Sequence, residues 1–296
     1  MKLNSAFIKN IHVTYGQEGH AWLDNLSDHL EKLSAQWNFQ IIHPVKDISY
    51  NFVAVVKLKS GLAILKTAPS AARLMVEAEW LKAHKKSVPT IFQIDKKNNA
   101  YLMEKLEPGI SLKYLVKEGQ DEKATRIISQ VILDLQSADT LLPMNYQHIS
   151  EHVSAYAFLR QHMDANIIER VESIFNELCA DRSNDIILHG GLHHDNILQS
   201  NTSWSVIDPH GYIGDPCAEI GPMIFNPLDC FPAHLPMQDI IERRLSILAE
   251  MLPFDLGHIK AWAFCLALRS AAWDVEGFGC PNDRTMEIAK ILYHIL

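Results

Sequence analysis

The hydrophobic period of the chain changes part-way along its length, and this change limits the folds open to it. From residue 41 to residue 67 apolar residues recur with a period near two, as in NFVAVVKLKSGLAILK, and Ser60-Gly61 supplies a turn signal. Beyond Pro108-Gly109 the apolar residues follow helical spacing, for example over 124–138. The pattern predicts an antiparallel sheet followed by a mostly helical region, with Pro108-Gly109 as the boundary between two lobes.

Other segments extend this two-part organisation. Residues 1 to about 40 have helical spacing, and a further helix is expected over 71–85. IFQI and AYLME read as two strands on either side of a turn, and residues 153–178 read as one helix. Three short apolar runs (IIL, NIL and WSVI) between residues 185 and 208 predict a short hairpin. At 296 residues the chain is long enough for two such lobes.

Composition excludes several classes of protein. The net charge is -8 and no basic stripe is present, so a nucleic-acid partner is not expected. No apolar run approaches the ~18 residues that span a bilayer, so no membrane association is expected. Five cysteines without a Cys-x-x-Cys pair indicate reduced thiols, and the N-terminal residues make a poor signal peptide. A cytoplasmic location is the expectation.

The densest polar stretch is HGGLHHDNILQSNTSWSVID, residues 189–208. If QSNTS forms the turn of the predicted hairpin, Asn196 and Asp208 lie side by side at its open end. Two oxygen ligands from adjacent strand ends suit Mg²⁺, which prefers hard oxygen donors. Either residue alone would read as a turn cap, but the pair favours a metal site.

The order of these motifs resembles a known family. His-Gly-x-Leu-His-x-x-Asn, followed by Ile-Asp-Pro and Gly-Asp-Pro, resembles the aminoglycoside phosphotransferases. IDPHGYIGDPCAEIGPMIFNP resembles their aminoglycoside and hydroxyurea resistance branch, as do WLDNL and LALRSAAW. The resemblance implies an α+β, protein-kinase-like fold, with a nucleotide-binding lobe over 1–106 and a helical lobe over 107–296 that carries the catalytic loop and the acceptor site. It also implies ATP and Mg²⁺ as cofactors and a cationic, streptomycin-like small molecule as phosphate acceptor. A monomer or homodimer is expected.

The resemblance carries over to particular positions. For ATP it implies Lys66, Glu77, Asn51, Met103, Glu104 and Leu106; for the catalytic loop His189, Gly191, Asn196 and Asp208; for the acceptor Asp274 and Glu276. Lys66 would hold the α- and β-phosphates, with Glu77, or failing that Glu79, as its ion-pair partner. The backbone carbonyl of Glu104 and the amide of Leu106 would meet the adenine. Tyr50, Asn51 and Phe52 would form the loop over the phosphates.

Gly191 departs from the family motif, which has aspartate at this position to accept the proton of the attacked hydroxyl. Glycine cannot accept a proton, and general-base help is worth ~10²–10⁴ in rate. Three interpretations remain open: an engineered or accidental substitution in an otherwise active enzyme, a natural nucleotide-binding pseudokinase, and an enzyme in which Asp195 or His193 serves instead. We favour an enzyme scaffold with impaired transfer.

Other interpretations attach to the same region. His189, His193, His194 and Asp195 could together form a zinc site, although no further pair completes a tetrahedral set. The acceptor could be another metabolite, such as a sugar. Glu219 and Asp229 are weaker candidates for acceptor contacts, and Asp215 is expected to cap the helix that follows it or to brace the loop.

Overall fold

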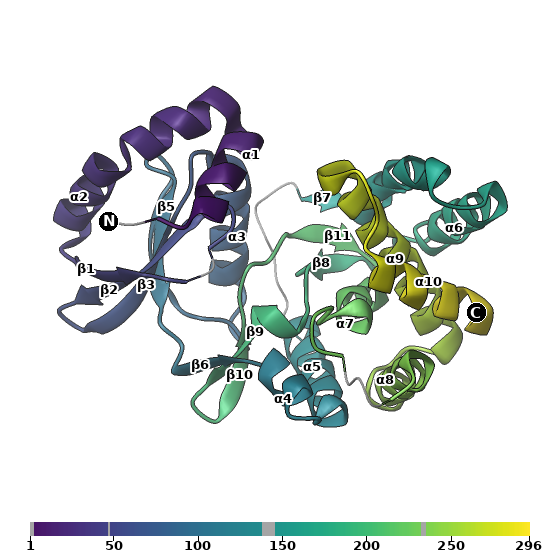
Figure 1. Cartoon of the computed structure of the whole chain (residues 1–296). Helices are drawn as coiled ribbons and strands as arrows, with labels where there is room; N and C mark the ends of the chain where they lie inside the picture. The colour runs from purple at the N-terminus through teal and green to yellow at the C-terminus, as the bar shows by residue number, and fades with distance from the viewer. Residues whose placement is uncertain (1–2, 47, 138–145, 232–234) are drawn as a thin grey trace. The chain divides into compact units, whose positions relative to one another are not determined.

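The structure is a computed structural model, and it describes residues 3–46, 48–137, 146–231 and 235–296 (Figure 1). The chain divides into two compact units. The first comprises Met1–Ala83 and Val88–Glu107, and the second comprises His84–Ser87 and Pro108–Leu296. Residues 84–87 belong to the second unit because Val206 donates a backbone hydrogen bond of 2.7 Å to the carbonyl of Ser87.

The first unit is a five-stranded antiparallel sheet with helices. Its elements are α1 (Ser5–Asp24), α2 (Leu26–Trp37), β1 (Gln40–Pro44), β2 (Phe52–Leu58), β3 (Gly61–Thr67), α3 (Ala71–Ala83), β4 (Ile91–Asp95) and β5 (Ala100–Glu104). The strand order is β1-β2-β3-β5-β4. The antiparallel sheet expected from the period of two is therefore confirmed, and so is the expected helical character near the N-terminus, over 5–24 and 26–37.

Side-chain alternation decides what each face of this sheet carries. On one face, core residues of β2 and β3 such as Phe52 and Leu65 pack with apolar residues of α1 and α2, among them Phe7 and Leu33. Successive residues of a strand point to opposite faces. Lys66, which follows Leu65 in β3, therefore points away from α1 and α2.

The second unit is mostly helical. Its elements are β6 (Pro108–Ser111), α4 (Lys113–Lys117), α5 (Asp121–Gln136), β7 (Gln147–His148), the 3₁₀ helix η1 (Ile149–Gln161), α6 (Ala165–Leu178), β8 (Ile186–Leu188), η2 (His194–Asn196), β9 (Ile197–Ser200), β10 (Ser203–Val206), β11 (Tyr212–Gly214), η3 (Pro216–Ile220), α7 (Gly221–Phe225), α8 (Met237–Met251), α9 (Leu256–Phe278) and α10 (Asp283–Ile295). The long helix α9 packs against η1, α6, α7, α8 and α10, and forms the centre of this unit. No helix of the described residues is long and apolar enough to cross a bilayer.

Two small sheets position the polar loops of the second unit. One has the order β10-β9-β6, in which β9 and β10 form an antiparallel hairpin. The other has the order β7-β11-β8. The hairpin was expected, whereas β6, β7 and β11 were not, because strands of two to four residues carry too few side chains for a period to show.

The prediction of a single helix over 153–178 is wrong in its first half. Residues 153–178 were predicted as a single helix, but the structure has a 3₁₀ helix that ends at Gln161 and an α-helix that begins at Ala165. The side chain of Asp164 accepts a hydrogen bond of 2.8 Å from the amide of Asn166, so it caps α6 and separates the two elements. In η1 the buried residues Tyr156 and Leu159 are three apart, which is the period of a 3₁₀ helix.

Candidate active site

A buried ion pair joins strand β3 to helix α3. Nζ of Lys66 lies 2.6 Å from Oε1 of Glu77, and both side chains are almost entirely buried. The hydroxyl of Tyr101 on β5 donates to the same oxygen, at 2.6 Å. The expected pairing of Lys66 with Glu77 is thus present, and Glu79 pairs instead with Lys96, at 2.9 Å.

The end of strand β5 carries the residues expected to meet adenine. The backbone amide of Glu104 donates to the carbonyl of Thr90 at 2.8 Å, and the Glu104 carboxylate accepts from the Thr90 amide at 3.1 Å. The side chains of Met103 and Leu106 are buried. Within the described residues the Leu106 amide donates no hydrogen bond, so it remains available for a ligand. Asn51 ends the connection between β1 and β2, the place expected for the phosphate loop.

The loop over residues 189–196, which is expected to be the catalytic loop, is held by two buried side chains. The Nε2–H of His189 donates to the carbonyl of Ile207 at 2.9 Å, and its Nδ1 accepts from the Gly191 amide at 3.3 Å. Burial lowers the pKa of His189 to about 3, so the ring is neutral. The carboxylate of Glu219 accepts from the amides of His189, at 2.7 Å, and Gly190, at 3.0 Å. The His189 ring and the Glu219 carboxylate thus hold the backbone of the loop around Gly191.

The β9–β10 hairpin brings the two expected magnesium ligands to its open end. Ile197 pairs with Val206, and one step further the amide of Ile207 donates to the carbonyl of Asn196 at 2.9 Å. Nδ2 of Asn196 donates to the carbonyl of Gly191 at 3.0 Å, which leaves Oδ1 as the donor atom a metal requires. Asp208 follows with a left-handed backbone, φ 59°. An amide oxygen and a carboxylate on adjacent strand ends fit Mg²⁺.

A cavity of about 200 Å³ opens beside Gly191. Its described lining includes His193 and His210 from the loops and Arg269, Ser270 and Trp273 from α9, and it contains no carboxylate. The guanidinium carbon of Arg269 lies 3.5 Å from the ring centroid of Trp273. A small hydroxyl compound could enter this cavity and reach the loop at Gly191.

Residues 39–277 match the family model for aminoglycoside/hydroxyurea antibiotic resistance kinases. The chain belongs to this family. It is a kinase, a phosphotransferase whose acceptor is a hydroxyl group.

Individual relatives agree with this assignment. The chain is 24% identical to the streptomycin 6-kinase of Streptomyces glaucescens, over 94% of this chain and 92% of that protein. It is 21% identical to the hydroxyurea phosphotransferase of Kitasatospora aureofaciens, over 94% and 82% of the two chains. A solved aminoglycoside phosphotransferase, APH(4)-Ia in a complex with ADP and hygromycin B, superposes with a TM-score of 0.60 at 14% identity, over 90% of this chain and 96% of that chain. The structural likeness confirms the protein-kinase-like α+β fold.

The interpretation of residues 189–195 as a zinc site is wrong. Among the described residues, no three His, Cys, Asp or Glu side chains gather where they could hold a metal ion. Both ring nitrogens of His189 are already hydrogen-bonded. The ring of His194 is fully buried, and burial holds its pKa well below the usual range. Asp195 pairs instead with Nζ of Lys113, at 3.3 Å.

The acids considered for acceptor contacts have different surroundings. Glu219 is buried against the loop backbone, and Asp229 pairs with Lys113 at 2.8 Å. Asp274, half-buried near the end of α9, accepts from the amide of Asn282 at 3.3 Å, and burial raises its pKa. Glu276 is exposed. Neither Asp274 nor Glu276 is among the residues that line the cavity, so their role in acceptor binding stays a prediction.

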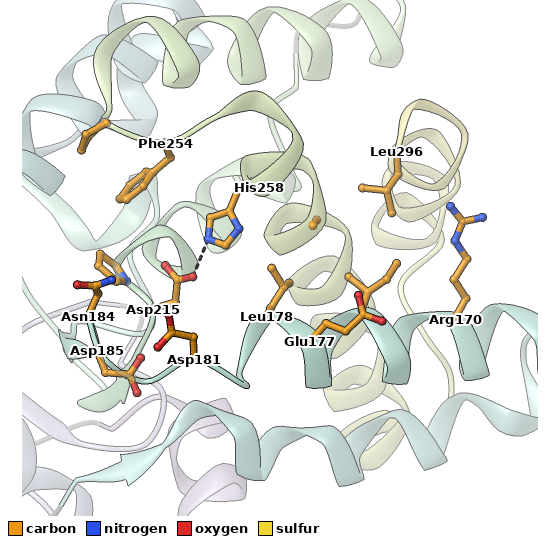
Figure 2. A pocket seen from close by; sticks show the side chains of 14 residues that line it. Arg170, Glu177, Leu178, Asp181, Asn184, Asp185, Asp215, Phe254, His258 and Leu296 are labelled. Atoms are coloured by element: carbon orange, nitrogen blue, oxygen red, sulfur yellow. Dashed lines mark hydrogen bonds and ion pairs between the residues drawn. The ribbon is translucent and has the colours of Figure 1, made fainter.

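Figure 2 shows a second pocket of this kinase, of about 820 Å³, with the carboxylates of Asp181, Asp185 and Asp215 gathered on one side. Oδ2 of Asp215 lies 2.6 Å from Nε2 of His258, drawn as a dashed line. Oδ1 of Asp215 accepts from the Cys217 amide at 2.8 Å, which confirms that it caps η3. The described lining has no residue in common with the cavity beside Gly191, so this pocket is distinct from the catalytic loop.

Proposed function

We propose that this protein transfers the γ-phosphate of ATP, bound with Mg²⁺, to a hydroxyl group of an aminoglycoside-like small molecule. The observation that carries the proposal is the buried pair of Lys66 and Glu77, at 2.6 Å. Removing two charges from water is costly, and replacing such a pair by apolar residues is often neutral or stabilising. A role in holding the phosphates of ATP would explain why this ion pair is present in a kinase fold.

Each unit supplies its own part of the chemistry. In the first unit Lys66 would bind the phosphates, Asn51 would lie in the loop over them, and the backbone at Glu104 and Leu106 would bind adenine. In the second unit Oδ1 of Asn196 and the carboxylate of Asp208 would hold Mg²⁺. The ion, when bound, neutralises the charge that develops on the phosphate oxygens. His189 and Glu219 hold the loop backbone, so they position these groups without contacting the substrate.

The size of the cavity limits how an aminoglycoside would bind. Sites for drug-sized ligands typically measure ~300–1,000 Å³, whereas the cavity beside Gly191 measures about 200 Å³. Only the ring that carries the reacting hydroxyl would enter it. The cationic groups of the remainder would then need carboxylates outside the cavity, and Asp274 and Glu276 on α9 are the proposed partners.

One observation favours a second candidate, a kinase of an uncharged hydroxyl compound. The described cavity lining carries the guanidinium of Arg269 and several imidazoles but no carboxylate. Such a wall does not attract a cation. A neutral acceptor of sugar size would fit the cavity without needing any acid outside it.

An acceptor panel with matched variants separates the two candidates. ADP release and product mass are followed with streptomycin, other aminoglycosides and neutral sugars. If the acceptor is an aminoglycoside, Asp274→Asn and Glu276→Gln should each raise its KM up to about fivefold, since a charge pair near the surface is worth up to ~1 kcal/mol. Glu169→Gln on the exposed face of α6 is the control and should change nothing. Binding of ATP with no transfer to any acceptor would instead establish a pseudokinase.

A further inference from the structure

The space beside Gly191 is already occupied by another side chain. A Cβ placed on Gly191 would lie 3.1 Å from Cε1 and 3.2 Å from Nε2 of His210. Backbone conformation does not require a glycine at position 191, because the residue of this loop with a left-handed backbone is Gly190, with φ 75°. The absence of a side chain at Gly191 therefore allows the imidazole edge of His210 to approach the loop backbone.

The fold fixes His210 in this place. Its amide donates to the carbonyl of His189 at 2.8 Å, which ties it to the catalytic loop. Its ring centroid lies 6.1 Å from the ring of Tyr212, edge to face, and 6.1 Å from the ring of Trp273. The residue is exposed, and its ring forms part of the cavity wall. The imidazole is thus framed by two aromatic rings and remains accessible to a ligand in the cavity.

The other candidate bases are less well placed. Asp195 pairs with Lys113 and does not line the cavity. His193 lines it, but its Nδ1 accepts from the Asp195 amide at 3.3 Å and its Nε2 lies 3.4 Å from Nδ2 of Asn196. An imidazole has two ring nitrogens, so in His210 one can be held by a neighbour while the other accepts a proton.

We propose that His210 is the catalytic base of this kinase and takes the place of the aspartate that Gly191 lacks. The inference rests on the proposed phosphotransfer. The acceptor hydroxyl oxygen forms a bond to the γ-phosphorus, and the bond from that phosphorus to the β–γ bridging oxygen breaks, its electron pair leaving with ADP. The hydroxyl proton passes to a ring nitrogen of His210 and from there to solvent.

A double-mutant cycle between positions 191 and 210 tests this role. In the native chain His210→Ala should lower kcat by about 10²-fold or more, with little change in the Kd for ATP. In a Gly191→Asp background the same replacement should cost much less, because the aspartate can accept the proton. Free imidazole should restore part of the rate to His210→Ala, which a purely structural role would not allow. His193→Ala, measured in parallel, represents the competing assignment.

Each outcome of this cycle either supports or overturns the role of His210 as the base. Non-additive losses together with imidazole rescue of His210→Ala support the proposal. Equal losses in both backgrounds, or rescue of His193→Ala alone, would overturn it while leaving the phosphotransferase intact. Transfer by Gly191→Asp but not by the native chain would show that position 191 lacks any substitute base, which also overturns it. If every variant binds ATP and none transfers phosphate, the proposed function itself fails, and the role of His210 falls with it.

Discussion

Among individual residues, Glu219 departs most from what its position in the sequence suggests. It was a weak candidate for contact with a cationic acceptor, yet its carboxylate is buried and accepts hydrogen bonds from two consecutive amides of the catalytic loop. These bonds favour the ionised form, but burial dominates and raises the pKa of Glu219 to about 7. The loop that carries Gly191 therefore rests on a carboxyl group that titrates near neutral pH.

We expect Glu219 to make the stability of the protein depend on pH. Its folded pKa of about 7 lies above the ordinary value of 4.5, so its contribution is fully present below pH 4.5 and is lost as the pH rises through 7. The loss amounts to at most ~3 kcal/mol. Urea unfolding between pH 4.5 and 8 should show this slope in the native protein and a flatter curve in Glu219→Gln.

The slope, and not the absolute stability, is the informative quantity for Glu219→Gln. The glutamine side chain would place an NH₂ group against a backbone amide, so a loss of stability at every pH is expected. Glu169→Gln, at an exposed position of α6, should retain the native slope. An unchanged slope in Glu219→Gln would show that another group titrates in this range.

At the scale of elements, the end of strand β5, where adenine is expected to bind, has side chains that are buried or already hydrogen-bonded. Glu104 uses its carboxylate for the Thr90 amide, at 3.1 Å, and its own amide for the Thr90 carbonyl. The Leu106 amide donates no hydrogen bond within the described residues. If adenine binds at this segment, we expect main-chain donors and acceptors to determine its affinity.

Variants of Glu104 and Leu106 should therefore differ in their effect on nucleotide affinity. Glu104→Ala should leave the Kd for a non-hydrolysable ATP analogue nearly unchanged, although losing the bond to Thr90 should cost ~1 kcal/mol of stability. Leu106→Pro removes the amide donor and should weaken binding about tenfold, whereas Leu106→Ala, which keeps the amide, should weaken it less. Isothermal titration measures the affinities, and circular dichroism checks that each variant is folded. A large loss with Glu104→Ala alone would place the adenine contact elsewhere.

At the scale of the whole molecule, the two compact units hold different groups of the proposed machinery. Lys66 and Glu77 belong to the first unit, and Asn196 and Asp208 belong to the second. If both units bind the same nucleotide through its phosphates and metal, ligand binding should stabilise the chain as a whole. That stabilisation should depend on magnesium, because Asn196 and Asp208 would act only through the ion.

We expect ATP with Mg²⁺ to raise the Tm, since a ligand at 100 times its Kd adds ~2.7 kcal/mol to the free energy of unfolding. Chelation of magnesium should remove most of this increase. Asp208→Asn should also reduce it, whereas Asp181→Asn, in the lining of the second pocket, should not. Differential scanning calorimetry with and without EDTA is the measurement. Equal stabilisation without magnesium would argue against a metal site at Asn196 and Asp208.

The sequence by itself determined the features that depend on local periodicity and short-range pairing. The strands and helices around Lys66 follow from a period of two and a period near 3.6, and alternation along β3 turns Lys66 away from Leu65 and the core it shares with α1 and α2. Asn196 and Asp208 lie at the same end of the β9–β10 hairpin because its turn sets the register, in which the Ile207 amide donates to the Asn196 carbonyl. These inferences need only the conformation of one or two neighbouring elements.

Only the tertiary structure decided what surrounds Gly191. The carboxylate of Glu219 reaches the loop from 29 residues away, and the ring of His210 lies so close to Gly191 that a Cβ there would be only 3.1 Å from it. A period describes which face of an element is apolar, but it says nothing about which distant polar side chain packs against a loop. Which side chain packs there depends on burial and on the close approach of non-local segments, here η3 and the residues after β10. These segments come together only when the second unit folds.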